Sequence, residues 1–171
     1  MVAKSKLQNV GIAVALTGLL LAGDLNARSS DRHQPIDISA DASVMEQAAG
    51  QPSLLSGNVV ITQGSLVINS AKGSVYVNGG EVTRVVLSGS PVRLRQTLDN
   101  GEPLIVNANT ADYNLRTDTV VLSGNVRISQ PSGNLSAPQA TYNMSSGRFE
   151  SKATTGGRVR MRFVPKTGRG N

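Results

Sequence analysis

The 171-residue chain contains no cysteine and no tryptophan, a single histidine, and few aromatic residues of any kind (3%). Without cysteine it can form no disulfide, no thiolate metal site and no lipid-modified thiol. His33 is the only imidazole, and it lies in a polar stretch where an exposed, inert histidine is expected. No Ser–His–Asp or Cys–His arrangement for covalent catalysis can therefore be assembled, and we expect a protein that is not an enzyme.

Acidic residues are too scattered to suggest a reaction centre. Asp37 and Asp41 lie near one expected strand, and Asp112 and Asp118 bracket a turn. Paired carboxylates can hydrolyse glycosides, but solvated carboxylates on turns and outer faces are far more common. No cluster of Asp or Asn with a bidentate Glu is present for calcium, and no glycine motif sits in a strand–loop–helix context. We expect no metal and no cofactor.

Residues 1–27 have the pattern of a secretory signal peptide. Lys4 and Lys6 precede an apolar run, residues 10–23, that is shorter than the roughly 20 residues needed to span a bilayer. Leu25-Asn26-Ala27 is an acceptable cleavage site, so we expect cleavage after Ala27. An uncleaved membrane anchor is the alternative. We expect residues 28–165 to form a single domain and residues 166–171 to form a flexible basic tail.

The positive charge predicts an anionic partner. The whole chain carries a net charge of +6, and 15 basic and 10 acidic residues remain once residues 1–27 are removed. Nucleic acid, an acidic membrane surface and phosphorylated lipid are the usual partners of such a chain. Export from the cytoplasm argues against nucleic acid.

A short phrase recurs along the chain. Leu-Ser-Gly-Asn-Val occurs at 55–59 and at 122–126, and Leu-Ser-Gly-Ser-Pro-Val at 87–92 is a near copy. Aligned on Gly57, Gly89, Gly124 and Gly157, the copies recur at intervals of roughly 33 residues, a period typical of units that complete their core by stacking on their neighbours. Each unit consists of alternating apolar and polar residues broken by turns, and its connections are too short for crossover helices. We therefore predict an all-β, elongated, antiparallel, two-sheeted structure that is open at its ends.

The arginines determine which residues face inward. In three of the four repeats they alternate with aliphatic residues, and an unpaired arginine cannot lie in an apolar core. A slip of one residue would expose the whole apolar set, so the register is strongly specified. The residues predicted to line the interior are Ile36, Ile38, Val59, Ile61, Leu66, Ile68, Val92, Leu94, Val106, Tyr113, Leu122, Val126, Ile128, Leu135, Tyr142, Met144, Val159, Met161 and Phe163.

Two states of that interior are compatible with the composition. Small aliphatic residues on facing sheets can leave a slot for a ligand, whereas a thin, fully collapsed core is the commoner outcome. The composition alone does not decide between them. A non-transport structural or polysaccharide-binding module with a filled core is the alternative function, although sugar platforms usually need the exposed aromatic residues that this chain lacks.

Both ends of the sheet are expected to be open edges. The last alternating segment contains Arg158, Val159, Arg160, Met161, Arg162 and Phe163 and is followed by Val164-Pro165. Proline cannot donate a hydrogen bond to a neighbouring strand, so it indicates an edge. Pro35, Ile36, Asp37 and Ile38 form the corresponding edge at the other end. Such edges either remain solvated or pair with another chain.

A set of motifs follows in a fixed order along about residues 31–165: QPI at 34–36, SGNVVITQG at 56–64, GSP at 89–91, LDNGEP at 98–103, ADYN at 111–114, VVLSGNVRISQ at 120–130, ATYN at 140–143 and GGRV at 156–159. In this order and spacing the motifs resemble the LptA family, also called OstA, which bridges the periplasm in lipopolysaccharide transport.

The resemblance implies a twisted, open-ended β-jelly roll in the periplasm. It implies that lipid A acyl chains lie between the sheets, with the phosphates and sugars outside. It also implies that copies stack head to tail, that the N-terminal edge meets the membrane-anchored partner LptC, and that the C-terminal edge meets the next copy or the outer-membrane translocon LptD. No nucleic acid and no cofactor are implied.

Overall fold

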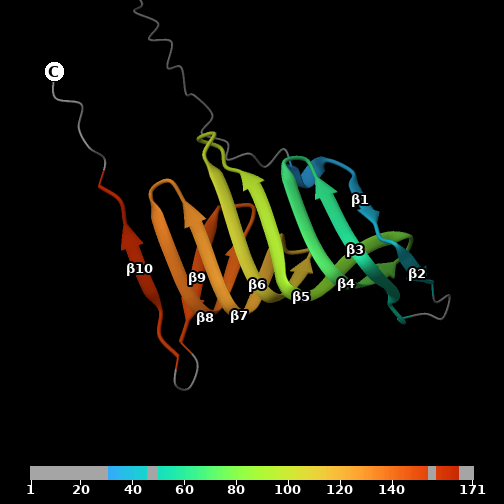
Figure 1. Ribbon diagram of the computed structural model, residues 1–171. Coiled ribbons are helices and arrows are strands. Elements are labelled where there is room, and N and C mark those ends of the chain that lie inside the picture. The colour runs from blue at the N-terminus through green and yellow to red at the C-terminus, as the bar shows by residue number, and fades with distance from the viewer. Residues whose placement is uncertain (1–30, 46–49, 154–156, 166–171) are drawn as a thin grey trace, which may run out of the picture.

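The computed structural model of the chain describes residues 31–45, 50–153 and 157–165 (Figure 1). The expected signal peptide, residues 1–27, and the expected tail, residues 166–171, lie outside these residues. Within them, no helix is both long enough and apolar enough to cross a membrane.

The described chain is almost entirely β-structure. A short 3-10 turn, η1 (Asp31–His33), precedes ten strands that form a single sheet, in which every pair is antiparallel. The strands are β1 (Ile36–Ser39), β2 (Ala42–Val44), β3 (Ser53–Gln63), β4 (Leu66–Asn78), β5 (Glu81–Thr97), β6 (Pro103–Asn114), β7 (Thr119–Gln130), β8 (Gly133–Asn143), β9 (Arg148–Lys152) and β10 (Arg160–Phe163).

The six central strands, β3 to β8, are long and bent. Each pair of neighbours shifts register near the middle, for example between Ser56 and Val59 in β3 and between Ser123 and Val126 in β7. At these corners Gly57 and Gly124 have φ of 74° and 76°, and the following Asn58 and Asn125 have φ of 42° and 50°. Glycine and asparagine tolerate this left-handed conformation best. The repeated Leu-Ser-Gly-Asn-Val phrase is therefore the corner of a bent strand.

The bends fold the sheet over on itself into two layers, as Figure 1 shows. The first halves of β3, β5 and β7 lie in one layer and their second halves lie in the other, while β4, β6 and β8 run in the opposite direction. The two sheets expected from the sequence are therefore the two layers of one continuous sheet. The reason is that a β-bulge bends a strand without ending its pairing.

Each outermost strand is split in two at the corner. At the N-terminal end β1 and β2 both pair with β3, and at the C-terminal end β9 and β10 both pair with β8. The last strand was expected from Arg158, but β10 begins at Arg160. Pairing of β8 passes from Ser136 with β10 to Gln139 with β9, so it skips Pro138, which has no N–H to donate. Pro35, which was expected in the first edge strand, directly precedes β1.

One row of apolar residues runs through the interior from the first strand to the last. Each member is the direct neighbour of the next in successive strands, which makes the row continuous across the sheet. We call it the interior row: Ile38, Ile61, Ile68, Leu94, Val106, Ile128, Leu135 and Met161.

Candidate lipid-binding interior and edge strands

The structure buries most of the residues predicted to face inward. Thirteen of them are no more than 9% exposed: Val59, Ile61, Leu66, Ile68, Val92, Leu94, Val106, Tyr113, Leu122, Val126, Ile128, Tyr142 and Met144. Arg93, Arg95 and Arg127, which alternate with members of this set, are exposed. The strand alternation inferred from the arginines is therefore the one observed. That these side chains bind lipid stays a prediction.

The predicted interior residues nearest the two ends are less covered. Ile36, Ile38 and Leu135 are partly buried and pack against the core. Val159 is half-buried, whereas Met161 is 58% and Phe163 is 78% exposed. The expectation of a covered interior fails for these last two residues. They lie on the edge strand β10, beyond which the described chain supplies no further strand to cover them.

The C-terminal end of the interior opens into an apolar cavity of about 180 Å³. Ile128 and Leu135 belong to the interior row, and Phe149 of β9 joins them in its wall. Met161 and Phe163 of β10, the strand next to Leu135, also line it. Exposed apolar side chains that continue a buried row indicate a surface that another apolar group covers.

Two pairs of tyrosine and glutamine tie the layers together, and sequence reasoning missed them. The hydroxyl of Tyr113 donates to Gln63 Oε1 at 2.9 Å, and that of Tyr142 donates to Gln96 Oε1 at 2.9 Å. All four side chains are no more than 7% exposed. The sequence does carry a signal for these pairs, because both members recur in the repeats. A glutamine ends the segments Ile61-Thr62-Gln63 and Leu94-Arg95-Gln96, and a tyrosine ends Ala111-Asp112-Tyr113 and Ala140-Thr141-Tyr142.

The N-terminal turn closes one side of this polar set. Asp31 is 6% exposed, accepts from Ser65 Oγ at 2.5 Å and accepts from Gln96 Nε2 at 3.2 Å. Gln63 Nε2 donates to the carbonyl of Gln34 at 3.3 Å. Buried polar groups stabilise a fold only when their hydrogen bonds are satisfied. The segment that leads into β1 is therefore hydrogen-bonded, through Asp31 and Gln34, to the glutamines of the two ties.

The two buried tyrosines are expected to make the folded state less stable at high pH. Burial is the main reason why the pKa of each is raised from 10.0 to about 12, with Asp118 contributing for Tyr113 and with Asp99 and Asp31 for Tyr142. A raised pKa means that the folded state holds its proton more tightly than the unfolded state. The contribution of each protonated tyrosine to the free energy of unfolding is thus complete below pH 10 and is lost as the pH rises toward about 12. The loss is up to about 2–3 kcal/mol for each tyrosine.

We expect the Tyr113→Phe/Tyr142→Phe variant to lack this pH dependence. At pH 7 it should be less stable by about 1–3 kcal/mol, because two buried glutamine oxygens lose their donors. Between pH 10 and 12 its unfolding free energy should fall less than that of the unaltered chain. Urea titrations at pH 8, 10, 11 and 12 test this. Parallel losses in the two chains would show that the tyrosines are not the titrating groups.

Two of the carboxylates considered for catalysis have polar partners within the fold. Asp112 forms an ion pair with Arg84, at 2.7 Å from Nε and 2.5 Å from Nη2. Asp41 accepts from Asn58 Nδ2 at 2.9 Å at the corner of β3. Over residues 31–45, 50–153 and 157–165, no group of three or more His, Cys, Asp or Glu side chains is placed to hold a metal ion.

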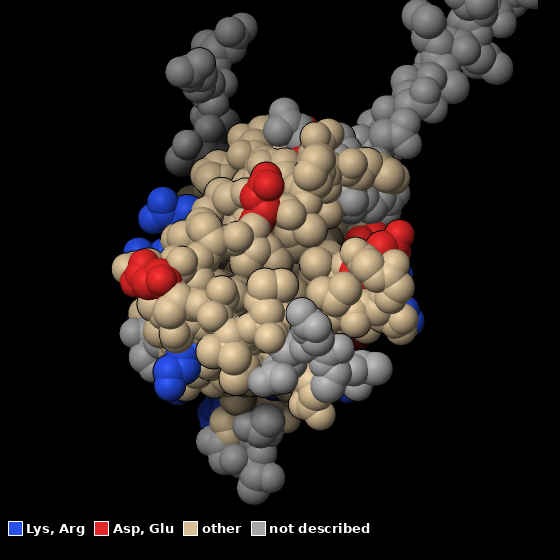
Figure 2. All heavy atoms as spheres, turned by 90° about the vertical axis from the view of Figure 1, so that its right-hand side faces the viewer, with Lys and Arg blue, Asp and Glu red and all other residues tan. Residues whose placement is uncertain are grey.

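The two ends of the sheet differ in charge. At the C-terminal end Arg158, Arg160 and Arg162 are exposed, and at the N-terminal end Asp37 and Asp41 are exposed. Figure 2 shows the N-terminal end, where acidic groups stand around a largely uncharged middle and basic groups lie toward the margin. Opposite charges at opposite ends favour contact between one end and the other.

Comparisons with known proteins agree with one another. Residues 37–148 match the family described as LptA/(LptD N-terminal domain) LPS transport protein. The chain is 32% identical to the lipopolysaccharide export system protein LptA of Escherichia coli K12 over 166 residues. This match covers 95% of this chain and 89% of that protein. It is 28% identical over 163 residues to LptA of Haemophilus influenzae, covering 94% of each.

A solved structure has the same fold. The crystal structure of LptH from Pseudomonas aeruginosa, described as the LptA-homologous periplasmic component of the lipopolysaccharide transport device, matches with a TM-score of 0.72 at 22% identity. The match covers 80% of this chain and 99% of that one. With the fold, the family match and the relatives pointing the same way, this chain belongs to the LptA/(LptD N-terminal domain) family of LPS transport proteins.

Proposed function

We propose that this protein works in the periplasm as a bridge component that binds lipopolysaccharide and carries it from the inner to the outer membrane. The acyl chains of lipid A lie between the two layers of the folded sheet. The observation that carries the proposal is the interior row, which runs without interruption from Ile38 on one edge strand to Met161 on the other. Family membership supports the same activity.

Hydrophobic burial supplies the affinity for such a ligand. Each methylene removed from water contributes about 0.8 kcal/mol, so one twelve-carbon acyl chain gains roughly 10 kcal/mol before losses. Because the row repeats similar aliphatic side chains at every strand, a chain that slides along it keeps nearly the same surroundings. Small changes in free energy from one position to the next suit transport better than one deep pocket.

Acyl chains must part the layers to enter. The middle of the row is closed, since Ile61, Ile68 and Val106 are 0% exposed. The C-terminal cavity and the exposed Met161 and Phe163 offer a place where separation can begin. The tyrosine–glutamine ties limit how far the layers separate without loss of a buried hydrogen bond.

The edge strands are the proposed assembly surfaces. The next copy, or the periplasmic domain of LptD, adds to β10, and LptC adds to β1 by the same backbone pairing. In each tie the tyrosine lies three strands further along the sheet than its glutamine. Tyr113 on β6 pairs with Gln63 on β3, and Tyr142 on β8 pairs with Gln96 on β5. Gln130 ends β7 as Gln63 ends β3 and Gln96 nearly ends β5. In the layer that carries the tyrosines, three strands further lies one strand beyond β9. A strand added at this edge would therefore complete the pattern.

We assign no catalytic step to the chain. Asp112 is held by Arg84, and Asp37 and Asp41 are exposed on the N-terminal edge and its corner. A glycosidase would require two carboxylates facing each other across a bound sugar, and these three belong to different surroundings.

Site-specific photocrosslinking tests where lipid binds. A photoreactive amino acid at Val106, which is 0% exposed, should form adducts with lipopolysaccharide, whereas one at the adjacent, exposed Ile105 should form far fewer. Neighbouring residues on a strand face opposite ways, so this pair is matched in every other respect. The purified protein without residues 1–27 is incubated with lipopolysaccharide, irradiated and probed with an antibody to lipid A.

The two positions separate the possible results. Adducts at position 106 in large excess over 105 support lipid between the layers. Folded protein that forms adducts at neither position overturns the proposal in favour of a filled core and the alternative of a non-transport binding module. Thermal unfolding of both variants must match that of the unaltered chain, since a photoreactive group at Val106 enters the core.

A further inference from the structure

Arginines form a regular row on the outer surface, directly beside the interior row. Arg93 on β5, Arg127 on β7 and Arg160 on β10 each follow a valine, and they are linked through Asn107 and Ser136 by direct strand pairing. We call Arg93, Arg127 and Arg160 the arginine row. Its members lie two strands apart, which corresponds to about 10 Å.

The row is exposed, and its charges are not neutralised within the fold. Arg93 Nε donates to Asn107 Oδ1 at 3.3 Å, which directs its guanidinium along the row. Among the residues that the structure describes, Arg84 pairs with Asp112 and Arg148 pairs with Glu150, and neither ion pair involves the row. Arg84 also lies over the ring of Tyr76 at 5.4 Å. The row thus differs from Arg84, whose charge is neutralised by its own sheet.

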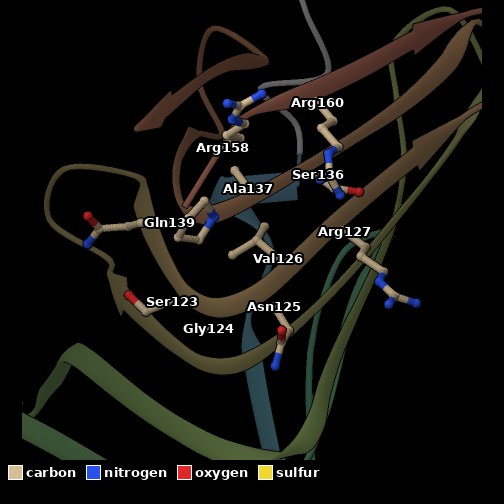
Figure 3. A pocket seen from close by; sticks show the side chains of 11 residues that line it. Ser123, Gly124, Asn125, Val126, Arg127, Ser136, Ala137, Gln139, Arg158 and Arg160 are labelled. Atoms are coloured by element: carbon tan, nitrogen blue, oxygen red, sulfur yellow. The ribbon is translucent and has the colours of Figure 1, made fainter. Parts of the chain in front are cut away.

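A cleft of about 640 Å³ lies at the C-terminal end of the row, where β9 and β10 separate (Figure 3). Arg127, Arg158 and Arg160 line it, and Figure 3 shows Val126 and Ala137 between them. Its other polar side chains include Ser123, Asn125, Ser136 and Gln139, and none of its lining residues is acidic.

The floor of this cleft reaches the interior. Val126 and Ala137 line the cleft, yet they are only 1% and 6% exposed and are paired to each other across β7 and β8. Guanidinium groups therefore surround a spot where the paired strands β7 and β8 carry only small aliphatic side chains, beside the place where β9 and β10 part. This arrangement suits an amphiphile with an anionic head outside and an apolar tail inside.

The cleft has a counterpart two repeats earlier in the chain. A cleft of about 500 Å³ is lined by the corner Gly57-Asn58, by Asn69, and by Arg93 and Arg95. Gly57, Asn69 and Arg93 correspond to Gly124, Ser136 and Arg160, and the separation along the sequence is the same for all three pairs. Two sites of one design, joined by Arg127, make the row continuous along the axis on which the strands stack.

We propose that the arginine row, through the cleft at its C-terminal end, binds phosphate monoesters on the head group of an amphiphile whose tails enter the interior where β9 and β10 separate. Arginine suits this ligand because its planar guanidinium makes paired, charge-assisted hydrogen bonds to phosphate oxygens. The inference rests on the proposed function for the identity of the amphiphile, and it adds where the phosphates bind.

Binding of lipid A to a row variant tests the inference. The variant Arg93→Gln/Arg127→Gln/Arg160→Gln removes the row, and Arg116→Gln/Arg148→Gln/Lys152→Gln removes the same charge from exposed positions elsewhere. Each protein is titrated with lipid A carrying its phosphates and with dephosphorylated lipid A. We expect the row variant to bind phosphorylated lipid A roughly tenfold more weakly, and the control variant to change by less than about threefold.

Each result has a defined meaning. Failure of the unaltered chain to bind either lipid overturns the proposed function itself. Equal binding of phosphorylated and dephosphorylated lipid A overturns only the inference, as does an equal loss in the row and control variants. Inorganic phosphate is titrated separately and followed by the NMR signals of the arginine side chains. If it saturates the row while the two lipids bind equally, the site is one for free phosphate and not for a lipid head group.

Discussion

If copies of the chain pair head to tail as proposed, the Met161→Pro variant should remain monomeric at concentrations at which the unaltered chain assembles. Val164 N–H donates to Ser132 O at 3.0 Å, so this residue's N–H points toward β8. Directions alternate along an antiparallel strand, and therefore the N–H of Met161 points away from β8, toward the open edge. Proline at this position removes a donor from the assembly surface and leaves the pairing of β10 with β8 in place. Loss of that bond, with an unpaired carbonyl on the partner, costs about 3 kcal/mol, or roughly a hundredfold in association.

Two further variants identify the cause of such a loss. Met161→Ala keeps the N–H and removes the exposed side chain, so it isolates the apolar contribution. Arg162→Pro removes an N–H that faces β8 and should detach β10 from its own sheet. Sedimentation velocity over a range of concentrations measures assembly, and circular dichroism verifies the fold. Unchanged, concentration-dependent oligomers of Met161→Pro would rule out pairing through β10.

The Leu94→Ala variant should lose about 3 kcal/mol of unfolding free energy, or about 10 °C in melting temperature. Leu94 is 1% exposed and lies near the centre of the interior row, paired with Ile68 on one side and Val106 on the other. Truncation removes three carbons and leaves a cavity that two hydrogen-bonded neighbouring strands cannot readily collapse into. Among single truncations in this chain, such central positions carry the largest stability cost because they are covered on every side.

The adjacent Arg95→Ala variant is the matched control. Arg95 is exposed on the opposite face of the same strand, so its loss should change stability by less than about 0.5 kcal/mol. Chemical unfolding followed by far-ultraviolet circular dichroism measures both. Equal losses would mean that the register of β5 differs from the one described. Lipid A added to Leu94→Ala should restore part of its stability, since a ligand that binds only the folded state stabilises it.

Alternation and repetition were sufficient to predict the strands and their two faces, and the resemblance of the ordered motifs predicted the family. In the segments around Arg93, Arg127 and Arg160, charged and aliphatic residues alternate, and burial of a charge is so costly that only one register is possible. The regular recurrence of the Leu-Ser-Gly phrase likewise predicted an elongated, antiparallel structure with exposed ends. These are local properties, and the pleat of a strand enforces them wherever the strand is placed.

Contacts between the layers could not be predicted in the same way. The ties between Tyr113 and Gln63 and between Tyr142 and Gln96 join residues 50 and 46 positions apart. Their partners depend on how sharply the corners bend and how the sheet twists. The cleft lined by Arg127, Arg158 and Arg160 depends in addition on the split of the last strand beside Pro138.

The sequence by itself determined which side chains face inward, where the strands turn and which family the chain belongs to. Tertiary structure alone decided that one sheet supplies both layers, that the middle of the interior is closed, and that Met161 and Phe163 are exposed at its end. The physical reason is the range of the interactions. Alternation follows from the backbone geometry of neighbouring residues. Closure of the interior requires the bends at all corners together. Exposure at the end arises because the described chain has no further strand beyond β10.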